Sequence, residues 1–426
     1  MSLASLGALM AFTPLVAGSS FAAFVGTYAG ATALWLLTMK RTRTPSLETT
    51  LILAALFRLV LFGSSPALSD DVLRYLWDGT LLESGRNPYA YTPDDAFLIA
   101  LREPWHSRIN NPEIPTIYPP VAQVLFFLSA VAGGSLFAWR LLLLAIDLVT
   151  IRLLHRSSPF AAFGWATMPL VLYEGFWSAH VEIAAASLLF AAWSVLERQR
   201  SFTAGTLLGA AVSVKVVPFA AAPVLLKIAS PKWRFGTGLT LVAVLPAIPF
   251  LLAGAFMKGF RDYATRWSFN SPLYDLVRLV IDNVGAAEWL KGFWTMIKDP
   301  LHAERVSDFV YRQLYTEMLT RVFLGCVFVI ALVLIYRRVA DPARAISWSV
   351  ATLLLLSPTI HPWYWLSVLP FALVTKDRLL VSLALMSPFS YLLYESGVPG
   401  AAVMAVCYGI PLIVTWRSPD GPLSPK

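Results

Sequence analysis

Long apolar runs separated by short polar turns make up most of the chain. The first run, at about residues 3–38, is almost uncharged and too long for one membrane span, so it predicts two helices joined near Gly18-Ser19-Ser20. The run at about 202–229 has Lys215 and Pro218 in its middle and predicts two short helices. Further runs fall at about 49–64, 137–154, 160–176, 183–197, 236–254, 320–336, 343–358, 364–375, 378–394 and 399–416.

The basic turns between these runs predict the orientation of the chain. Many runs are followed by Lys or Arg, which is typical of cytoplasmic loops. If the run at about 121–132 crossed the membrane, every later basic turn would lie on the outer side. This run is also shorter than the roughly 20 residues that a span needs. We therefore predict a re-entrant or interfacial helix that begins at Pro119-Pro120 and ends at Gly133-Gly134. The expected fold is an all-α polytopic membrane protein with about 12–14 transmembrane helices.

Composition agrees with this class. Of the 426 residues, 57% are apolar and 14% are charged, whereas a soluble domain has about 25% charged residues. The net charge of +8 comes from short clusters that act as topology determinants, so nucleic acid is not expected as a partner. Cys326 and Cys407 lie alone in apolar runs, which leaves neither a disulfide framework nor a cysteine metal cluster.

Two long loops remain on the outer side, at about 65–118 and 255–319. The first contains eight acidic residues and four arginines. The second contains amphipathic stretches at 272–280 and 287–294, which suit helices lying in the membrane interface. Residues 1–417 are predicted to form a single membrane domain, followed by a short disordered cytoplasmic tail at 418–426.

The first outer loop begins with a predicted helix. Ser69 can cap its first turn, where the helix dipole favours Asp70 and Asp71. Helical spacing puts Arg74 four residues from Asp70, and puts Asp71 and Asp78 two turns apart on one face. A well-capped surface helix would explain this pattern without function. However, neighbouring carboxylates at the mouth of a membrane cavity repel each other, which is costly unless a cation or substrate uses them.

The same loop ends in a rigid, proline-rich stretch. Residues 112–120 contain four prolines, which fix an extended backbone. A rigid loop of this kind over a membrane cavity is suited to a binding site.

These residues together resemble a known family. Asp70–Gly79, Gly85–Tyr89 and Pro115–Pro120 resemble the bacterial branch of the glycosyltransferase C superfamily, which contains polyprenol-phosphate-mannose-dependent mannosyltransferases. Ser178–Glu182 stands where the family often has a Gly-His-x-Asp-like turn, although Ala179 and Glu182 depart from that pattern. Weaker matches are Lys215–Pro218 to a Lys-x-x-Pro element, and Trp267–Asn270 and His361–Tyr364 to later family elements.

The resemblance implies an inverting sugar transfer on the outer face of the bacterial inner (plasma) membrane. A hexose, with mannose expected, would pass from a polyprenyl-phosphate donor to a glycan or lipid acceptor, and an acid of the first outer loop would be the general base. That base is Asp70 or Asp71 here. Asp71 is preferred because it shares a face with Asp78 and leaves Asp70 free for Arg74. The sequence assigns no certain cofactor: the acidic pair could bind Mg²⁺ or Mn²⁺ or do without a metal.

The donor's lipid phosphate is anionic, so cations are expected at the outer ends of helices. The candidates are Lys215, Arg261, Arg266 and Arg58. For Arg261 and Arg266, a solvated or snorkelling charge explains the residue equally well. Lys215 lies within an apolar run, where an ionisable group is expensive, so contact with the donor phosphate is the first hypothesis and an internal ion pair the second.

The remaining polar candidates have weaker support. His361 lies at an outer helix end and is a candidate for sugar or phosphate contact, whereas an aromatic belt explains its aromatic neighbours without function. Asp147, in mid-helix, is expected to form a structural interhelical contact. The complete set of substrate-binding candidates is Arg74, Asp78, Tyr118, His180, Glu182, Lys215, Arg266, His361 and Tyr364.

A transporter or lipid flippase is the alternative from another class. Such proteins tend to have internal repeats and paired ionisable groups at the bilayer midplane. Here most unusual charges gather at one face, which favours an enzyme. A ligase that moves a lipid-linked oligosaccharide would keep the fold and change the chemistry.

Overall fold

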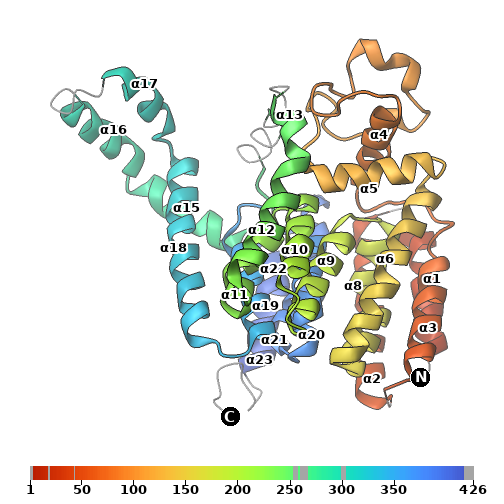
Figure 1. Cartoon of the computed structure of the whole chain (residues 1–426). Coiled ribbons are helices and arrows are strands. Elements are labelled where there is room, and N and C mark those ends of the chain that lie inside the picture. Colours follow the sequence, from red (N-terminus) through yellow and green to blue (C-terminus); the bar gives the residue numbers. More distant parts are fainter. Residues whose placement is uncertain are drawn as a thin grey trace.

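The computed structural model describes residues 3–17, 20–42, 44–252, 258–259, 267–298 and 304–416. Regular structure in these ranges is helical (Figure 1), and their one β-type pairing is an isolated parallel bridge between Phe269 and Thr359. The predicted tail at 418–426 and the candidates Arg261 and Arg266 lie outside the described residues.

The first half of the chain consists mainly of longer helices. The predicted helix of the first outer loop and the short apolar run that follows this loop lie between them. The predicted pair of helices in the first run is confirmed, and Ser20 accepts a hydrogen bond from the backbone N–H of Ala23 at the start of the second. The elements are α1 (Leu3–Ala17), α2 (Phe21–Arg41), α3 (Leu47–Leu59), α4 (Asp71–Glu83), α5 (Pro120–Val131), α6 (Leu136–Ser157), α7 (Pro159–Thr167), α8 (Pro169–Leu172), the π-helical turn η3 (Tyr173–Trp177) and α9 (Glu182–Leu196).

The second half divides into a compact group and an arm. The predicted break at Lys215 is confirmed, because this residue ends α10 in an extended conformation. The elements are α10 (Ser201–Val214), α11 (Ala222–Ile228), α12 (Lys232–Val244), α13 (Ile248–Leu252), α15 (Pro272–Asn283), α16 (Ala286–Ile297), α17 (Glu304–Gln313), α18 (Thr316–Arg338), α19 (Pro342–Leu356), η6 (Pro362–Ser367), α20 (Leu369–Val374), α21 (Arg378–Met386), η7 (Ser387–Tyr394), α22 (Gly400–Met404) and α23 (Ile410–Trp416).

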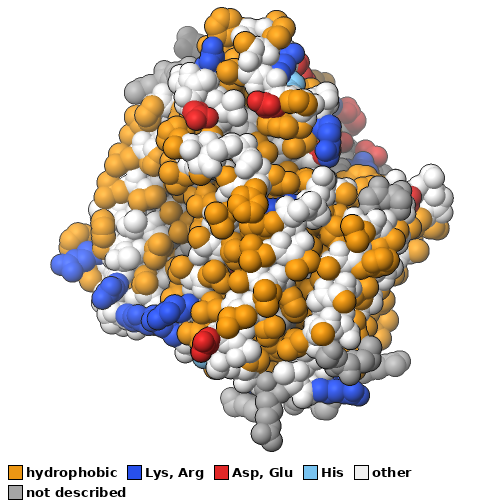
Figure 2. Space-filling view, turned by 90° about the vertical axis from the view of Figure 1, so that its right-hand side faces the viewer, with side chains coloured by type: hydrophobic (Ala, Val, Ile, Leu, Met, Phe, Trp, Pro, Cys, Tyr) orange, Lys and Arg blue, Asp and Glu red, His pale blue; other side chains and the backbone are white. Residues whose placement is uncertain are grey.

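Three helical stretches are long and apolar enough to cross a membrane by themselves: Phe21–Arg41, Lys232–Leu251 and Thr316–Arg338. Eight shorter apolar helices of 10–17 residues accompany them in the described part of the chain. Figure 2 shows a broad apolar surface across the middle of one face, with charged side chains towards its two ends. These features are those of a membrane protein, whereas the count of about 12–14 spans stays a prediction.

Helix α5 has the boundaries that the prolines and glycines predict. Pro119 and Pro120 stand at its first positions, and Gly133 and Gly134 follow its end with φ of +115° and +61°. The helix runs across the longer helices rather than along them (Figure 1). It crosses α4 so closely that a Cβ on Gly79 would lie 2.5 Å from the carbonyl oxygen of Phe126. The outer-loop helix is thereby fixed against the body.

Helices α15, α16 and α17 form an arm beside α18 that reaches away from the body (Figure 1). The two amphipathic stretches predicted in the second outer loop are therefore helical. Large apolar side chains on the arm are exposed, among them Leu276, Trp289, Met296 and Phe309. Their exposure agrees with the expectation of interfacial helices.

The structure corrects the proposal that Arg58 contacts the donor phosphate. Its guanidinium is fully buried and lies 2.7 Å from the equally buried carboxylate of Asp147. It also donates a hydrogen bond of 2.8 Å to the carbonyl of Ala166, while Trp165 donates one of 2.6 Å to Asp147. A buried carboxylate and a buried guanidinium neutralise each other. The structural role expected for Asp147 is confirmed, and Arg58 is its partner.

Candidate active site

A cavity of about 600 Å³ lies where the start of α4, the proline-rich loop, the end of α10 and the segments around residues 268 and 362 meet. Those segments are far apart in the sequence, so the cavity is a product of the fold. Seven of the predicted site residues line it: Asp70, Asp71, Arg74, Tyr118, Lys215, His361 and Tyr364.

The two neighbouring aspartates at the start of α4 have different surroundings. Asp70, whose side chain is 42% exposed, pairs with Arg108 at 2.8 Å, so the predicted pairing of Asp70 with Arg74 is wrong. Asp71 is half-buried, accepts a 3.0 Å hydrogen bond from the amide of Asn110, and has its backbone N–H 3.2 Å from Ser69 Oγ. Burial raises the pKa of Asp71, while the Asn110 hydrogen bond and the Lys215 charge oppose the rise. The two carboxylates therefore differ in their partners, because an arginine holds Asp70 and a neutral amide contacts Asp71.

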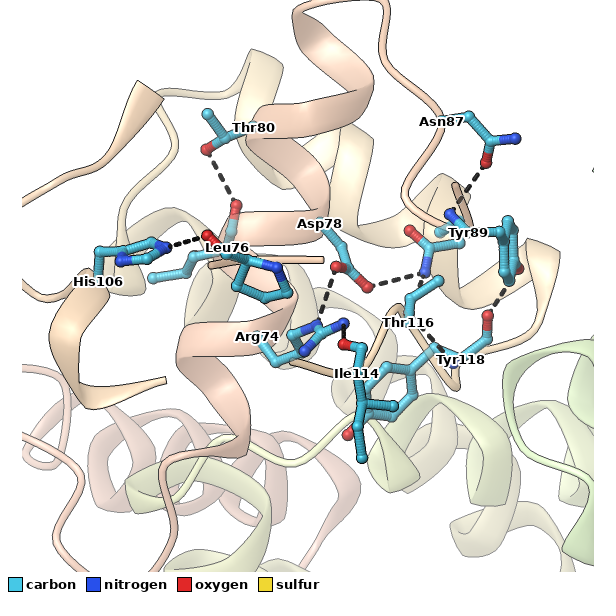
Figure 3. Close-up of polar contacts among 12 residues, drawn as sticks. Arg74, Leu76, Asp78, Thr80, Asn87, Tyr89, His106, Ile114, Thr116 and Tyr118 are labelled. Atoms are coloured by element: carbon cyan, nitrogen blue, oxygen red, sulfur yellow. Dashed lines mark hydrogen bonds and ion pairs between the residues drawn. The ribbon is translucent and has the colours of Figure 1, made fainter. Parts of the chain in front are cut away.

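Arg74 and Asp78 tie the proline-rich loop to α4 (Figure 3). Arg74 Nε lies 3.2 Å from Asp78 Oδ1, and its other end donates a 2.6 Å hydrogen bond to the carbonyl of Ile114. Asp78 also accepts a 3.0 Å hydrogen bond from Gln123 of α5, which donates a second to Thr116. Asp78 is fully buried and is not among the residues that line the cavity. Burial raises its pKa, against the opposing charge of Arg74.

Lys215 reaches the cavity from the break after α10. Its amine lies 2.8 Å from Glu182, and its side chain is 16% exposed whereas that of Glu182 is 2% exposed. The amine also lies 5.4 Å from the ring centre of Tyr118 and 5.0 Å from that of Tyr364. The internal ion pair left open by the sequence is thus present. The cation nevertheless faces the cavity, where aromatic rings and a carboxylate hold it.

His180 lies behind Asp71 in the turn between η3 and α9. Its ring is fully buried and stacks on Trp363 with centres 3.9 Å apart. The residue before it, Ala179, has φ of +58°, and its carbonyl accepts a 2.7 Å hydrogen bond from Trp139. A positive φ favours glycine, which gives a physical reason for the family's commoner glycine at this position.

His361 lines the cavity, and contacts between two segments that are far apart in the sequence hold it there. Its ring lies between Phe269, at 4.7 Å, and Trp363, at 4.3 Å, measured between ring centres. The backbone of Phe269 donates to the Pro358 carbonyl at 2.9 Å and accepts from Ile360 at 2.8 Å. The two late sequence elements around residues 269 and 361 are therefore neighbours, which their separate positions in the chain do not reveal.

Several residues around the site were not singled out from the sequence. Glu174, Tyr75 and Tyr391 surround His180 or its partners. Arg140 is fully buried and donates to the carbonyls of Phe62, Ser64 and Trp177, which fixes the start of the outer loop near the His180 turn. Glu174 and Arg140 stand in or beside apolar runs, and that signal could have identified them.

The described residues contain no group of three or more His, Cys, Asp or Glu side chains arranged to hold a metal ion. Arg108 and Asn110 already contact the carboxylates of Asp70 and Asp71. Among the described residues, these carboxylates therefore do not form a dedicated metal site.

Comparison with known families identifies the class of protein. The profile of the MptA_B family, described as "Alpha-(1->6)-mannopyranosyltransferase, N-terminal domain", matches residues 2–230, which is more than half of the chain. The chain belongs to this family and is, at that level, a mannosyl-transferring membrane glycosyltransferase. The matched region includes Asp71, His180 and Lys215. Comparisons with curated proteins and with solved structures give no match.

Proposed function

We propose that the protein is a glycosyltransferase C-like enzyme that moves mannose from a polyprenyl-phosphate donor to a glycan or lipid acceptor. Asp71 acts as the general base, and the anomeric configuration is inverted. The observation that carries this proposal is that Asp71 and Lys215 line the same cavity from different elements. A base for the acceptor and a cation for the donor phosphate are the two charges that this transfer needs.

Asp71 suits the role of base better than Asp70. A general base must be available to accept a proton from the acceptor, whereas Asp70 is held in an ion pair with Arg108. Asp71 is partly desolvated, which raises its pKa, and its hydrogen-bond donor, the Asn110 amide, carries no charge. In the proposed step it takes the acceptor's hydroxyl proton while the acceptor oxygen attacks the anomeric carbon. The bond from that carbon to the phosphate oxygen breaks with its electron pair, so a single displacement inverts the configuration.

Lys215 is proposed to hold the leaving lipid phosphate. The cation is already placed at the cavity, and Glu182 neutralises it while no phosphate is bound. A charge-assisted hydrogen bond contributes about 1.5–3 kcal/mol. Loss of this contact would therefore slow transfer roughly tenfold to a hundredfold. Tyr118, Tyr364 and His361 complete the proposed wall for sugar and phosphate.

The side of the membrane is proposed from the chain's charges. With the basic turns in the cytoplasm, the loop that carries Asp71 faces outwards, as a transfer outside the cytoplasm requires. External labelling of a cysteine introduced at Glu113 would test this. Labelling only after permeabilisation would invert the orientation.

The activity itself can be measured with purified protein in liposomes. The substrates are labelled polyprenyl-phosphate mannose and a membrane lipid extract, with and without EDTA. The proposal predicts labelled product of inverted configuration and free polyprenyl phosphate. Movement of the donor across the bilayer without transfer would support the flippase instead. Transfer abolished by EDTA and restored by Mg²⁺ or Mn²⁺ would show that a metal takes part.

A further inference from the structure

His180 lies between two carboxyl groups, one at each ring nitrogen. Its Nδ1 is 3.9 Å from Asp71 Oδ2, and its Nε2 is 3.5 Å from Glu174 Oε2. Stacking on Trp363 holds the plane of the ring. An imidazole with a carboxyl group at each end has the arrangement of a proton relay, because it can accept a proton on one nitrogen while it releases another.

Glu174 is placed to be the far end of that relay. It is fully buried in the turn η3, and the hydroxyl of Tyr391 lies 3.1 and 3.2 Å from its two oxygens. In the described residues its side-chain partners are therefore a phenol and an imidazole, neither of which carries a fixed positive charge. The Tyr391 hydroxyl donates to the carboxylate and favours its ionised form, which the relay needs at the start of each transfer. Receiving a proton then removes the cost of the buried charge.

A further polar group and a charged group also lie near His180. Tyr75 places its hydroxyl 3.4 Å from Nδ1, beside Asp71. Burial, together with the nearby charge of Lys215, lowers the pKa of His180. These effects favour the neutral imidazole, which can accept a proton at one nitrogen while it releases one from the other. Glu182 forms an ion pair with that lysine at 2.8 Å.

We propose that His180 and Glu174 take the acceptor proton on from Asp71 as the sugar is transferred. This proposal rests on the proposed function, in which Asp71 is the base. The proton on Asp71 passes to Nδ1 of His180 while the Nε2 proton passes to Glu174. The two transfers reverse after product release, and Asp71 then gives the proton to water in the cavity.

The chemical advantage lies in the return reaction. While Asp71 holds the proton, it can give it back to the new glycosidic oxygen and allow the phosphate to attack again. Moving the proton to Glu174 leaves no acid beside that oxygen. Both distances must shorten by under about 1 Å to reach hydrogen-bond length, and contacts of this kind often tighten only when substrate is bound. His180 and Glu174 are thus relay residues that act through Asp71.

The test uses the full-length protein in liposomes with labelled polyprenyl-phosphate mannose and a membrane lipid extract. Glu174→Gln keeps the shape and the contact with Tyr391 but cannot accept the proton. We expect its single-turnover rate to fall roughly a hundredfold, with the donor KM unchanged and the rate restored by added imidazole. The matched control is Glu182→Gln, which removes another buried carboxyl group. That variant should raise the donor KM and gain nothing from imidazole.

Each result decides the matter. An unchanged rate in Glu174→Gln, or a loss that imidazole does not restore, overturns the relay. If the variant does not fold, the transfer rate of the unaltered protein is measured in mixtures of H₂O and D₂O. A curved dependence on the D₂O fraction supports the movement of several protons, whereas a straight one contradicts the relay. Asp71→Asn separates the two proposals. Activity in Asp71→Asn overturns the base and the relay, whereas an inactive Asp71→Asn with a normal Glu174→Gln overturns the relay alone.

Discussion

Lys215 and Glu182 form a 2.8 Å ion pair at the edge of the cavity that Asp71 lines. The carboxylate is nearly fully buried, whereas the amine is partly exposed to the cavity. Glu182 is therefore part of the packed interior, whereas Lys215 can contact a ligand in the cavity. Mutation of one or both residues can therefore separate the effect of the pair on stability from its effect on catalysis.

Replacing Lys215 should damage both stability and catalysis. Lys215→Met leaves Glu182 buried without its partner, which is expected to lower the free energy of unfolding by roughly 3–5 kcal/mol. The double variant Lys215→Met with Glu182→Gln removes both charges and should regain most of that loss, but its kcat/KM for the donor should stay at least tenfold low. Thermal unfolding and transfer assays on both variants check this. Normal activity in the double variant would exclude Lys215 as the phosphate contact.

The Arg58–Asp147 pair should affect stability alone. Arg58→Met leaves Asp147 as an unpaired buried charge and should destabilise the fold by several kcal/mol. Adding Asp147→Leu removes that charge and should restore Tm. Donor KM per folded molecule should be the same in the double variant as in the unaltered protein. An increase in that KM would return Arg58 to the list of phosphate ligands.

Ala179 has a backbone conformation that glycine adopts more readily. At φ of +58° the backbone strain of an L-residue costs the folded state roughly 1–2 kcal/mol. Glycine avoids that strain but costs about 0.5–1 kcal/mol of stability, because its unfolded chain has greater conformational freedom. Ala179→Gly should therefore raise the free energy of unfolding by up to about 1 kcal/mol, and Ala179→Val should lower it. Chemical denaturation of the two variants measures both changes. Destabilisation by glycine would contradict the backbone argument.

The pH dependence of transfer should report the carboxyl group of Asp71. The base must be ionised, so activity is lost as the pH falls through its pKa. Because burial raises that pKa, the acid limb of kcat/KM should lie above the ordinary aspartate value of about 3.9. Asn110→Ala removes a hydrogen bond that lowers the pKa, so it should move the limb to still higher pH. A limb that moves to lower pH in this variant would be inconsistent with Asp71 as the base.

The local features of the fold could be predicted, whereas the pairing of distant charges could not. Pro120 and Gly133 predict the ends of α5 because their backbone restrictions act within a few residues. The partner of Asp70 depends on how the loop folds back, and Arg108 occupies the place expected for Arg74. Likewise, Glu174 is one acidic residue in an apolar run until the turn at Ala179 brings His180 against it. Convergence of Asp71, Lys215 and His361 depends on packing across the whole chain.

The central claim, that Asp71 is the base for mannosyl transfer, is tested most directly by comparing Asp71→Asn with Asp70→Asn. Both changes remove one negative charge from the start of α4 at nearly the same place. The single-turnover rate with labelled polyprenyl-phosphate mannose should fall by a factor of about 10² or more in Asp71→Asn and stay within about tenfold in Asp70→Asn. A normal rate in Asp71→Asn, or the large loss in Asp70→Asn alone, would contradict the claim.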